Sequence, residues 1–139
     1  MAGSVHPYLR YRDAPAAIDW LERAFGFERR DVIENPDGTI AHAELWLGDA
    51  VIMLGSGGDD LEGPPPDDLR AARSSIYIGT PDVEAIHARA REAGTVVSDL
   101  FDQDYGSRDF QARDPGGNHW TFGTYLQEAQ AAAASPDSA

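Results

Sequence analysis

The sequence contains no cysteine and no lysine, and these two absences exclude several kinds of chemistry. Without cysteine the chain cannot form disulfides, thiolate nucleophiles or cysteine-ligated zinc and iron–sulfur sites. Without lysine no side chain can form a Schiff base with a carbonyl substrate, because all 11 basic residues are arginines. Covalent chemistry through a thiolate or a side-chain amine is therefore outside the reach of this chain.

Positive charge is also scarce, because 11 arginines face 24 acidic residues and the formal net charge is -13. Such a chain repels phosphates, so we expect no nucleic-acid partner, and its charge favours a cationic or neutral small ligand. The acidity could equally serve only to keep the protein soluble. No segment approaches the roughly 20 apolar residues that span a membrane, so we expect a soluble, cytoplasmic protein without a membrane partner.

The first part of this 139-residue chain has the pattern of a strand, a helix and three further strands. Alternation and helical spacing predict a strand at 5–11, a helix at 14–26, a strand at 28–34, a turn at 35–38 and a hairpin at 40–54. Asp13 is placed to cap the helix N-terminus, Pro15 lies in its first turn, and Gly26 ends it. This part therefore predicts a βαβββ unit.

The same order returns after residue 73. The pattern predicts a strand at 74–79, a helix at 80–94, a strand near 95–98 and a last hairpin in "RDFQARDPGGNHWTFGTY". Thr80 is placed as the helix N-cap and Gly94 as its end. The interval from Gly26 to Gly94 equals that from Met53 to Thr121 on the last strands, so we interpret the chain as a structural duplication.

This duplication divides the chain into two modules. The first βαβββ module is predicted to occupy residues 1–54, and the second residues 74–126. Between them, residues 55–73 are rich in Gly, Pro and Asp, which is typical of a surface linker. Residues 127–139 are predicted to form a disordered tail.

The turn at Gly48 and Asp49 assigns the faces of the first hairpin, because it pairs Leu47 with Ala50. One face is then uniformly apolar and is predicted to pack under a helix: Ala43, Leu45, Leu47, Ala50, Ile52 and Leu54. The other face is mixed: His42, Glu44, Trp46, Val51 and Met53. The second hairpin divides in the same way, with Phe110, Ala112, Trp120 and Phe122 on the apolar side and Asp109, Gln111, Arg113, His119 and Thr121 on the other.

The mixed faces are predicted to line a pocket. Trp46 and Met53 are costly to leave in water, which favours a curved sheet around a ligand. The alternative is an ordinary antiparallel sheet with one face in solvent. Two further histidines are not expected to be catalytic. His119 follows a turn and is interpreted as structural or exposed at a rim, and His87 is interpreted as a solvent-exposed residue of the second helix.

Three segments, "HPYLRYRDAPAAIDWLERAFGFE", "AELWLGDAVIMLG" and "YGSRDFQARDPGGNHWTFG", cover most of residues 5–126. In this order they resemble the vicinal-oxygen-chelate superfamily, which includes glyoxalase I, extradiol dioxygenases and the bleomycin- and fosfomycin-resistance proteins. The resemblance implies an α+β protein of the glyoxalase/bleomycin-resistance-like fold, in which two βαβββ modules form a U-shaped partial barrel. It also implies a homodimer.

Metal-dependent members of that superfamily use one ligand on the first and one on the last strand of each module. The resemblance places these positions at His6, Met53, Ser75 and Thr121. Only the histidine is an ordinary ligand for a divalent cation, because thioethers and hydroxyls bind such ions poorly. We therefore expect no metal cofactor. The alternative is one divalent metal ion at a displaced site made by His6, His42 and Glu44.

The expected pocket would bind a flat organic molecule. The resemblance implies that His6 and Ser75 face this pocket, and alternation from them adds Tyr8 and Tyr77. Together with the mixed hairpin faces, the predicted ligand-binding residues are His6, Tyr8, His42, Glu44, Trp46, Met53, Ser75, Tyr77, Gln111 and Thr121. Aromatic rings with a few polar groups suit an aromatic ligand, and a carboxylate among them could attract a cationic one.

The resulting hypothesis is a binding protein, similar to the drug-resistance branch of the superfamily, that sequesters an aromatic or cationic compound without metal. A second hypothesis is an enzyme. It would be either a metal-dependent lyase, isomerase or dioxygenase using His6 with Glu44 or His42, or a metal-free enzyme. In a metal-free enzyme Glu44 or His6 would be the general base, and Tyr8 or His42 would polarise the substrate. A third is a ligand sensor without chemistry.

Overall fold

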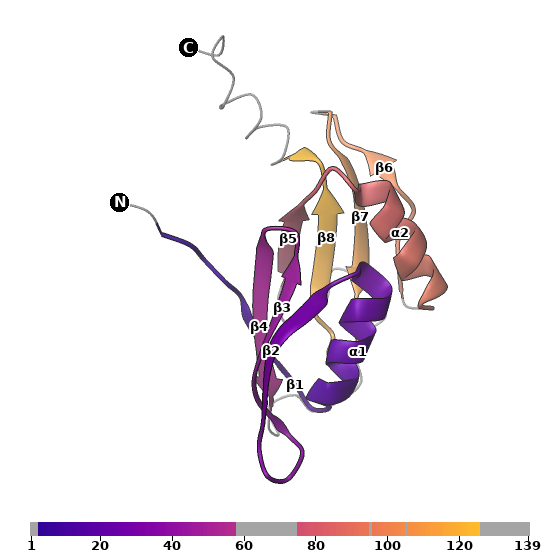
Figure 1. The fold of residues 1–139 in the computed structure, drawn as a ribbon. Coiled ribbons are helices and arrows are strands. Elements are labelled where there is room, and N and C mark those ends of the chain that lie inside the picture. Colours follow the sequence, from indigo (N-terminus) through magenta and orange to yellow (C-terminus); the bar gives the residue numbers. More distant parts are fainter. Residues whose placement is uncertain (1–2, 58–74, 95, 105, 126–139) are drawn as a thin grey trace.

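Two successive repeats of one strand, one helix and three strands make up the protein (Figure 1). The computed structural model describes residues 3–57, 75–94, 96–104 and 106–125. The first module contains β1 (Tyr8–Tyr11), α1 (Ala14–Phe25), β2 (Glu28–Glu34), β3 (Ile40–Leu47) and β4 (Ala50–Ser56). The second contains β5 (Ser75–Gly79), α2 (Val83–Glu92), β6 (Phe101–Asp102), β7 (Arg108–Arg113) and β8 (His119–Gly123). The predicted α+β fold with two βαβββ modules is confirmed.

The predicted linker and tail lie almost entirely outside the described residues. Strand β4 continues through Gly55 and Ser56, so these two residues extend a strand into the range assigned to the linker. The linker from residue 58 onward and the tail at 127–139 stay predictions. Within the described ranges, no helix is long and apolar enough to cross a membrane.

Each module closes its own four-stranded sheet by pairing its first strand with its last. The strand orders are β1-β4-β3-β2 and β5-β8-β7-β6. The first and last strands run parallel, with Tyr8 opposite Met53 in one sheet and Tyr77 opposite Thr121 in the other. The remaining pairs are antiparallel. The two sheets therefore repeat one another in register as well as in order.

Helix α1 has the ends that its sequence predicts. The Asp13 carboxylate accepts a hydrogen bond from the Ala16 backbone N–H at 3.1 Å, which satisfies one free donor of the first turn. Gly26 ends the helix with φ +86°, a conformation that favours glycine. Arg89 from α2 lies against this glycine and donates to the Glu22 carbonyl oxygen at 3.0 Å. The end of α1 is thus held by the other module.

The second module differs from its prediction at the start of the helix. Helix α2 begins at Val83, not at Pro81, because the Thr80 hydroxyl accepts a hydrogen bond from the Asp82 N–H and holds a turn there. At its other end the helix closes at Glu92 with Ala93 as its cap, and Gly94 follows with φ +76°, as expected for the residue that stops a helix. The strand predicted near 95–98 is wrong in the described part of this segment, where a single bridge joins Val97 to Ala112.

His87 is buried, and its predicted solvent-exposed position is wrong. Its Nε2 atom lies 2.8 Å from the Ser98 carbonyl oxygen, and its ring packs edge-on against Phe110 with centroids 4.9 Å apart. This face of α2 packs on β7, which the charged run on the helix concealed.

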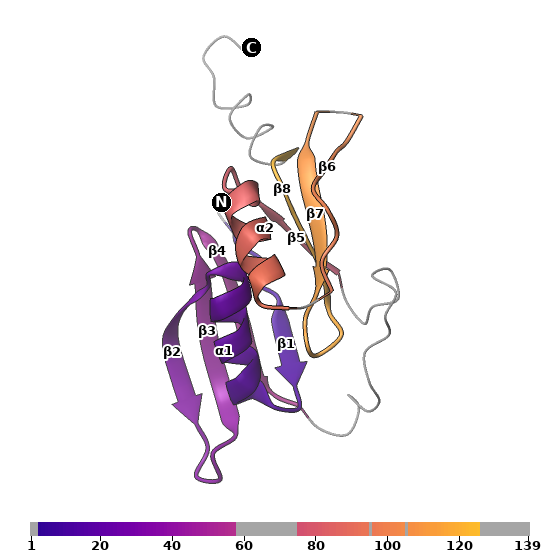
Figure 2. The same ribbon diagram turned by 90° about the vertical axis from the view of Figure 1, so that its right-hand side faces the viewer.

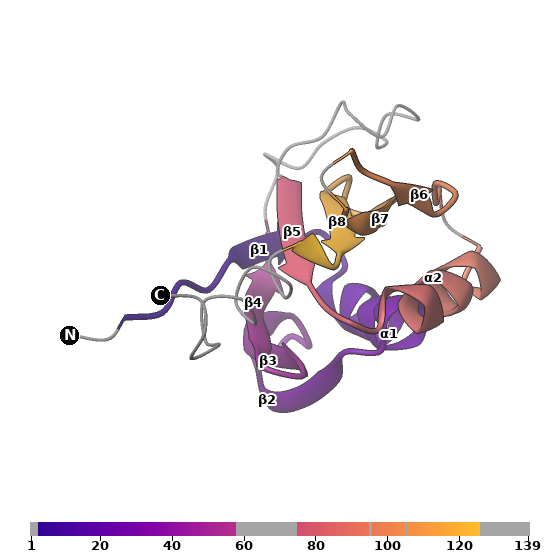
Figure 3. The same cartoon turned by 90° about the horizontal axis from the view of Figure 1, so that it is seen from above.

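The core lies between the two helices and the two sheets. Helix α1 covers the first sheet and α2 the second (Figure 2), and both helices lie inside the angle between the sheets (Figure 3). Phe25 is fully buried at the junction, with ring centroids 4.7 Å from Phe122 and 5.4 Å from Trp120. The predicted apolar faces are confirmed, with these residues buried: Ala43, Leu45, Ile52, Leu54, Phe110, Ala112, Trp120 and Phe122.

One buried carboxylate, that of Asp114, joins the two modules through a hydrogen-bond network. Its Oδ2 atom accepts from the Tyr11 hydroxyl at 2.5 Å, from Trp120 Nε1 at 2.9 Å and from Asn118 Nδ2 at 3.1 Å. Its Oδ1 atom accepts from the backbone N–H groups of Gly116 and Asn118. Burial raises the pKa of the Tyr11 hydroxyl well above its ordinary value, and the neighbouring Asp114 raises it further. Because Tyr11 is on β1, this network ties the first module to the loop between β7 and β8.

Candidate functional site

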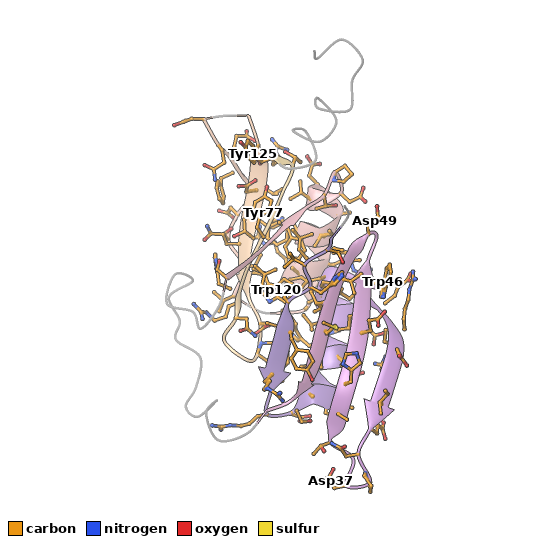
Figure 4. The ribbon with its side chains drawn as sticks, turned by 90° about the vertical axis from the view of Figure 1, so that its left-hand side faces the viewer. Asp37, Trp46, Asp49, Tyr77, Trp120 and Tyr125 are labelled. Carbon is orange, nitrogen blue, oxygen red and sulfur yellow. The ribbon has the colours of Figure 1, made fainter. Side chains whose placement is uncertain are left out.

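The predicted pocket-lining residues lie on the outer faces of the two sheets, away from the helices. The predicted hairpin register is confirmed, with Glu44 opposite Met53 and Gln111 opposite Thr121. Because both helices lie inside the angle between the sheets, the two outer faces point in different directions (Figure 3). Trp46 and Tyr77 accordingly rise from separate sheets (Figure 4). One chain therefore divides the predicted residues between the faces of two sheets.

On the first sheet, Trp46 is held by two charged neighbours. Its Nε1 atom donates to the Glu44 carboxylate at 2.7 Å, and the Arg30 guanidinium lies 4.2 Å from the ring centroid. The Arg30 contact covers one ring face through a cation–π interaction. The sequence analysis missed Arg30 because β2 has a bulge between Arg29 and Asp31, which interrupts the alternation of faces.

His6, Tyr8 and His42 also lie on this side of the first sheet. The two His6 nitrogens contact the Ser4 hydroxyl at 2.8 Å and the Val51 carbonyl oxygen at 3.3 Å. The Tyr8 and His42 rings have centroids 6.1 Å apart. His6 is exposed, whereas His42 is half-buried. The group can offer imidazole and phenol hydrogen bonds to a bound molecule.

The donor set does not fit a divalent metal. At the four positions of the family's ligands, His6 is joined by a thioether and two hydroxyls, from Met53, Ser75 and Thr121. In the described part of the chain, no three His, Asp or Glu side chains gather into a group that could hold a metal ion. His6, His42 and Glu44 thus do not assemble within one chain, and the Glu44 carboxylate is bonded to Trp46.

On the second sheet, Ser75 and His119 form a hydrogen-bonded pair. The Ser75 hydroxyl lies 2.8 Å from His119 Nδ1, while the buried Nε2 atom of His119 has no hydrogen-bond partner among the residues that the structure describes. Burial lowers the pKa of His119 below its usual 6.5, and the charge of Arg113 lowers it further. Both effects favour the neutral form of the imidazole. This pairing joins strands that are distant in sequence, so spacing alone gave no signal of it.

Asp109 is a second residue whose environment the sequence analysis missed. Alternation places it on the outer face, yet it is only 2% exposed. Its carboxylate accepts from the Ser107 hydroxyl at 2.5 Å and from Gln103 Nε2 at 3.1 Å. The loop that carries Gln103 and Ser107 covers this end of the second sheet. The face available to a ligand is therefore narrower than the alternation of side chains indicates. Gln111 and Thr121 remain half-buried beside it.

A cavity of about 480 Å³ lies elsewhere, at the junction of the two modules. Its lining includes the β3–β4 turn at Gly48 and Asp49, the segment before α2 at Pro81 and Asp82, and Arg89. None of the predicted ligand-binding residues lines it. The cavity is thus distinct from the outer faces.

The lowered pKa of His119 predicts a pH effect on stability. The unfolded chain binds a proton at His119 more readily than the folded chain does. The contribution of His119 to the free energy of unfolding is therefore fully present above pH 6.5 and is lost as the pH falls through the lowered pKa of the folded state. Lowering the pH from about 7.5 to about 5 should therefore reduce the free energy of unfolding of the wild type more than that of His119→Gln, which retains a partner for Ser75. Urea unfolding at the two pH values measures both losses. Equal losses in the two proteins would contradict the predicted effect.

Comparisons with known proteins agree on one family. The model of the Glyoxalase/Bleomycin resistance protein/Dioxygenase superfamily matches residues 3–122. An uncharacterized protein of Mycobacterium bovis is 33% identical over 132 residues, covering 90% of this chain and 85% of its own. The crystal structure of TioX from Micromonospora sp. ML1 has a TM-score of 0.65 at 29% identity, covering 87% of this chain and 94% of its own. The bleomycin-binding protein from Streptomyces verticillus, complexed with copper(II)-bleomycin, has a TM-score of 0.60 at 22% identity, covering 88% and 97%. The chain therefore belongs to the Glyoxalase/Bleomycin resistance protein/Dioxygenase superfamily.

Proposed function

We propose that this protein is cytoplasmic and sequesters an aromatic small molecule without metal and without turnover. The ligand would bind in a site shared by two copies of the chain. The observation that carries the proposal is the pair of outer faces, which present aromatic and polar side chains to solvent. Tyr8 is 40% exposed and Tyr77 37% exposed. Sites for small molecules are lined mainly by apolar and aromatic side chains with a few polar groups, which is the composition of these faces.

A homodimer would complete the site. The outer face of the first sheet of one chain would meet the outer face of the second sheet of its partner, and two-fold symmetry would make two equal ligand sites. Each site would combine residues that lie on different sheets of one chain. In this dimer the exposed tyrosines would be covered by the partner chain instead of by solvent.

Sequestration is favoured over catalysis by the side chains on these faces. The groups at the family's ligand positions do not suit a divalent cation, and the strongest candidate base, Glu44, already accepts a hydrogen bond from Trp46. The structurally similar bleomycin-binding protein is a binder of a small molecule by its own description. A role in resistance to such a compound follows from this proposal.

The test begins with the oligomeric state of the full chain by sedimentation, which should be a dimer. Copper(II)-bleomycin and a panel of planar aromatic compounds would then be titrated, with tryptophan fluorescence as the signal. Trp20 and Trp120 are buried, so quenching should come from Trp46 and disappear in Trp46→Phe. The ligand should be recovered unchanged at saturation. A retained metal that is lost in Glu44→Ala, together with conversion of the compound, would instead establish the enzyme.

A further inference from the structure

Tyr8 lies across the outer face of the first sheet, with its hydroxyl above a glycine. A Cβ atom built on Gly55 would come within 2.5 Å of the Tyr8 hydroxyl oxygen, so any side chain at this position would displace it. The hydroxyl donates to the Ala41 carbonyl oxygen on β3 at 3.2 Å. The ring therefore leaves β1, passes over β4 at Gly55 and reaches β3. One of its faces lies against the sheet, and 40% of the residue remains exposed.

Tyr77 has the same arrangement on the second sheet. A Cβ atom on Gly123 would come within 2.6 Å of the Tyr77 hydroxyl oxygen. That hydroxyl accepts from the Tyr125 N–H at 3.2 Å. Tyr8 pairs with Met53 and Tyr77 with Thr121, and in each case the glycine follows two residues later on the same strand. Tyrosine over glycine is therefore a duplicated feature of the fold.

A tyrosine held in this way is suited to stacking. Its hydroxyl is held by a hydrogen bond, and the ring lies over the backbone of a strand. On Tyr8 the exposed Arg10 guanidinium lies 5.2 Å from the ring centroid, so part of this ring is in contact with a cation. Little conformational freedom is then lost when a flat ring packs on the exposed side of the tyrosine. Trp46 is held differently, by a hydrogen bond to Glu44 and by the Arg30 guanidinium 4.2 Å from its ring centroid. The two tyrosines are the predicted ligand-binding residues that share one arrangement over a glycine on both sheets.

We propose that Tyr8 and Tyr77 are a duplicated pair of stacking residues that select a planar, conjugated ring system as the ligand. The inference rests on the proposed function, since a ring held between them requires Tyr8 of one chain and Tyr77 of its partner in one site. Gly55 and Gly123 act as positioning residues, because they set the height of each ring above its sheet. The ligand is then held by two ring faces instead of one.

The experiment uses proflavine, a flat tricyclic dye, as the probe for the full-length chain. Equilibrium dialysis should show Tyr8→Leu and Tyr77→Leu each weakening binding on the order of tenfold, as loss of one stacked ring does in other proteins. Tyr8→Phe and Tyr77→Phe keep the ring and should stay within about threefold of the wild type. Urea unfolding of each variant confirms that the fold is intact.

The glycine variants test the positioning role. Gly55→Ala should lift the Tyr8 ring and weaken proflavine binding, even though no residue that touches the dye has changed. Gly3→Ala is the matched control, because a Cβ atom there meets nothing within 4 Å. Gly123→Ala is the weaker test, since its Cβ atom would also collide with the buried Asp109 carboxylate and could disturb the fold.

Three results would overturn the stacking inference. Wild-type affinity for proflavine in both leucine variants would show that the two tyrosines do not stack on the ligand, and the proposed function would still stand. Failure of proflavine to bind, while a non-aromatic probe such as fosfomycin does bind, would show a small-molecule site of another kind. Failure of the aromatic panel and of fosfomycin alike would refute both the stacking inference and the proposed function.

Discussion

Replacing Asp114 by alanine should lower the free energy of unfolding by about 3–5 kcal/mol, one of the two largest losses we expect from single substitutions in this chain. The carboxylate accepts five hydrogen bonds, and three of them come from side chains of Tyr11, Asn118 and Trp120. All three are buried, so their donors would find no water after the substitution. A domain at the low end of the typical stability range of about 5–15 kcal/mol would then be close to unfolding at room temperature.

Urea unfolding followed by circular dichroism measures this loss. Asp49→Ala is the matched control, because Asp49 is exposed in the β3–β4 turn, and it should change stability by less than about 0.5 kcal/mol. Tyr11→Phe removes one of the five hydrogen bonds and should cost about 1–2 kcal/mol. If Asp114→Ala were as stable as Asp49→Ala, the network would not hold the modules together.

Replacing Phe25 by alanine should destabilise the protein by about 3–5 kcal/mol, as expected for a large aromatic side chain removed from a packed core. Phe25 is fully buried and its ring contacts those of Trp20, Phe27, Trp120 and Phe122. Two of these rings belong to the second module. The cavity left behind would therefore open at the junction of the modules, where neither sheet can move inward alone.

Thermal and urea unfolding should report a single transition for Phe25→Ala at a lower midpoint. Phe25→Leu leaves a smaller cavity and should cost less than the alanine variant. Ile33→Ala, at a 52%-exposed position on β2, serves as the control and should be nearly neutral. Two separate transitions in Phe25→Ala would show that the modules fold independently, contrary to the shared core.

Local pattern was sufficient to predict most of the fold. The alternation in β3 and β4 has one register once the turn at Gly48 is recognised, and the structure has that register. The ends of α1 follow from the capping chemistry of Asp13 and Gly26. At Thr80 the same reasoning failed, because a threonine hydroxyl can hold a turn as well as begin a helix.

The site was harder to predict because its geometry depends on contacts between distant residues. Arg30 reaches Trp46 only because a bulge interrupts β2, and a bulge has no mark in a hydrophobicity pattern. The role of Asp114 could be recognised only once Tyr11 was placed beside it. Alternation correctly assigned residues to the two faces of each sheet. It gives no information on the angle between the sheets, which decides whether two faces meet within one chain.

Each module pairs its first strand with its last, so equivalent residues of the two modules lie at equivalent positions of their sheets. The two modules can therefore be compared residue by residue. On the core side both halves keep apolar residues, because a change there would disturb packing shared by both modules. On the outer faces, Tyr8 and Tyr77 occupy equivalent positions, while Met53 corresponds to Thr121. The outer faces of the two sheets can therefore present different chemistry at equivalent positions without disturbing the core that both modules share.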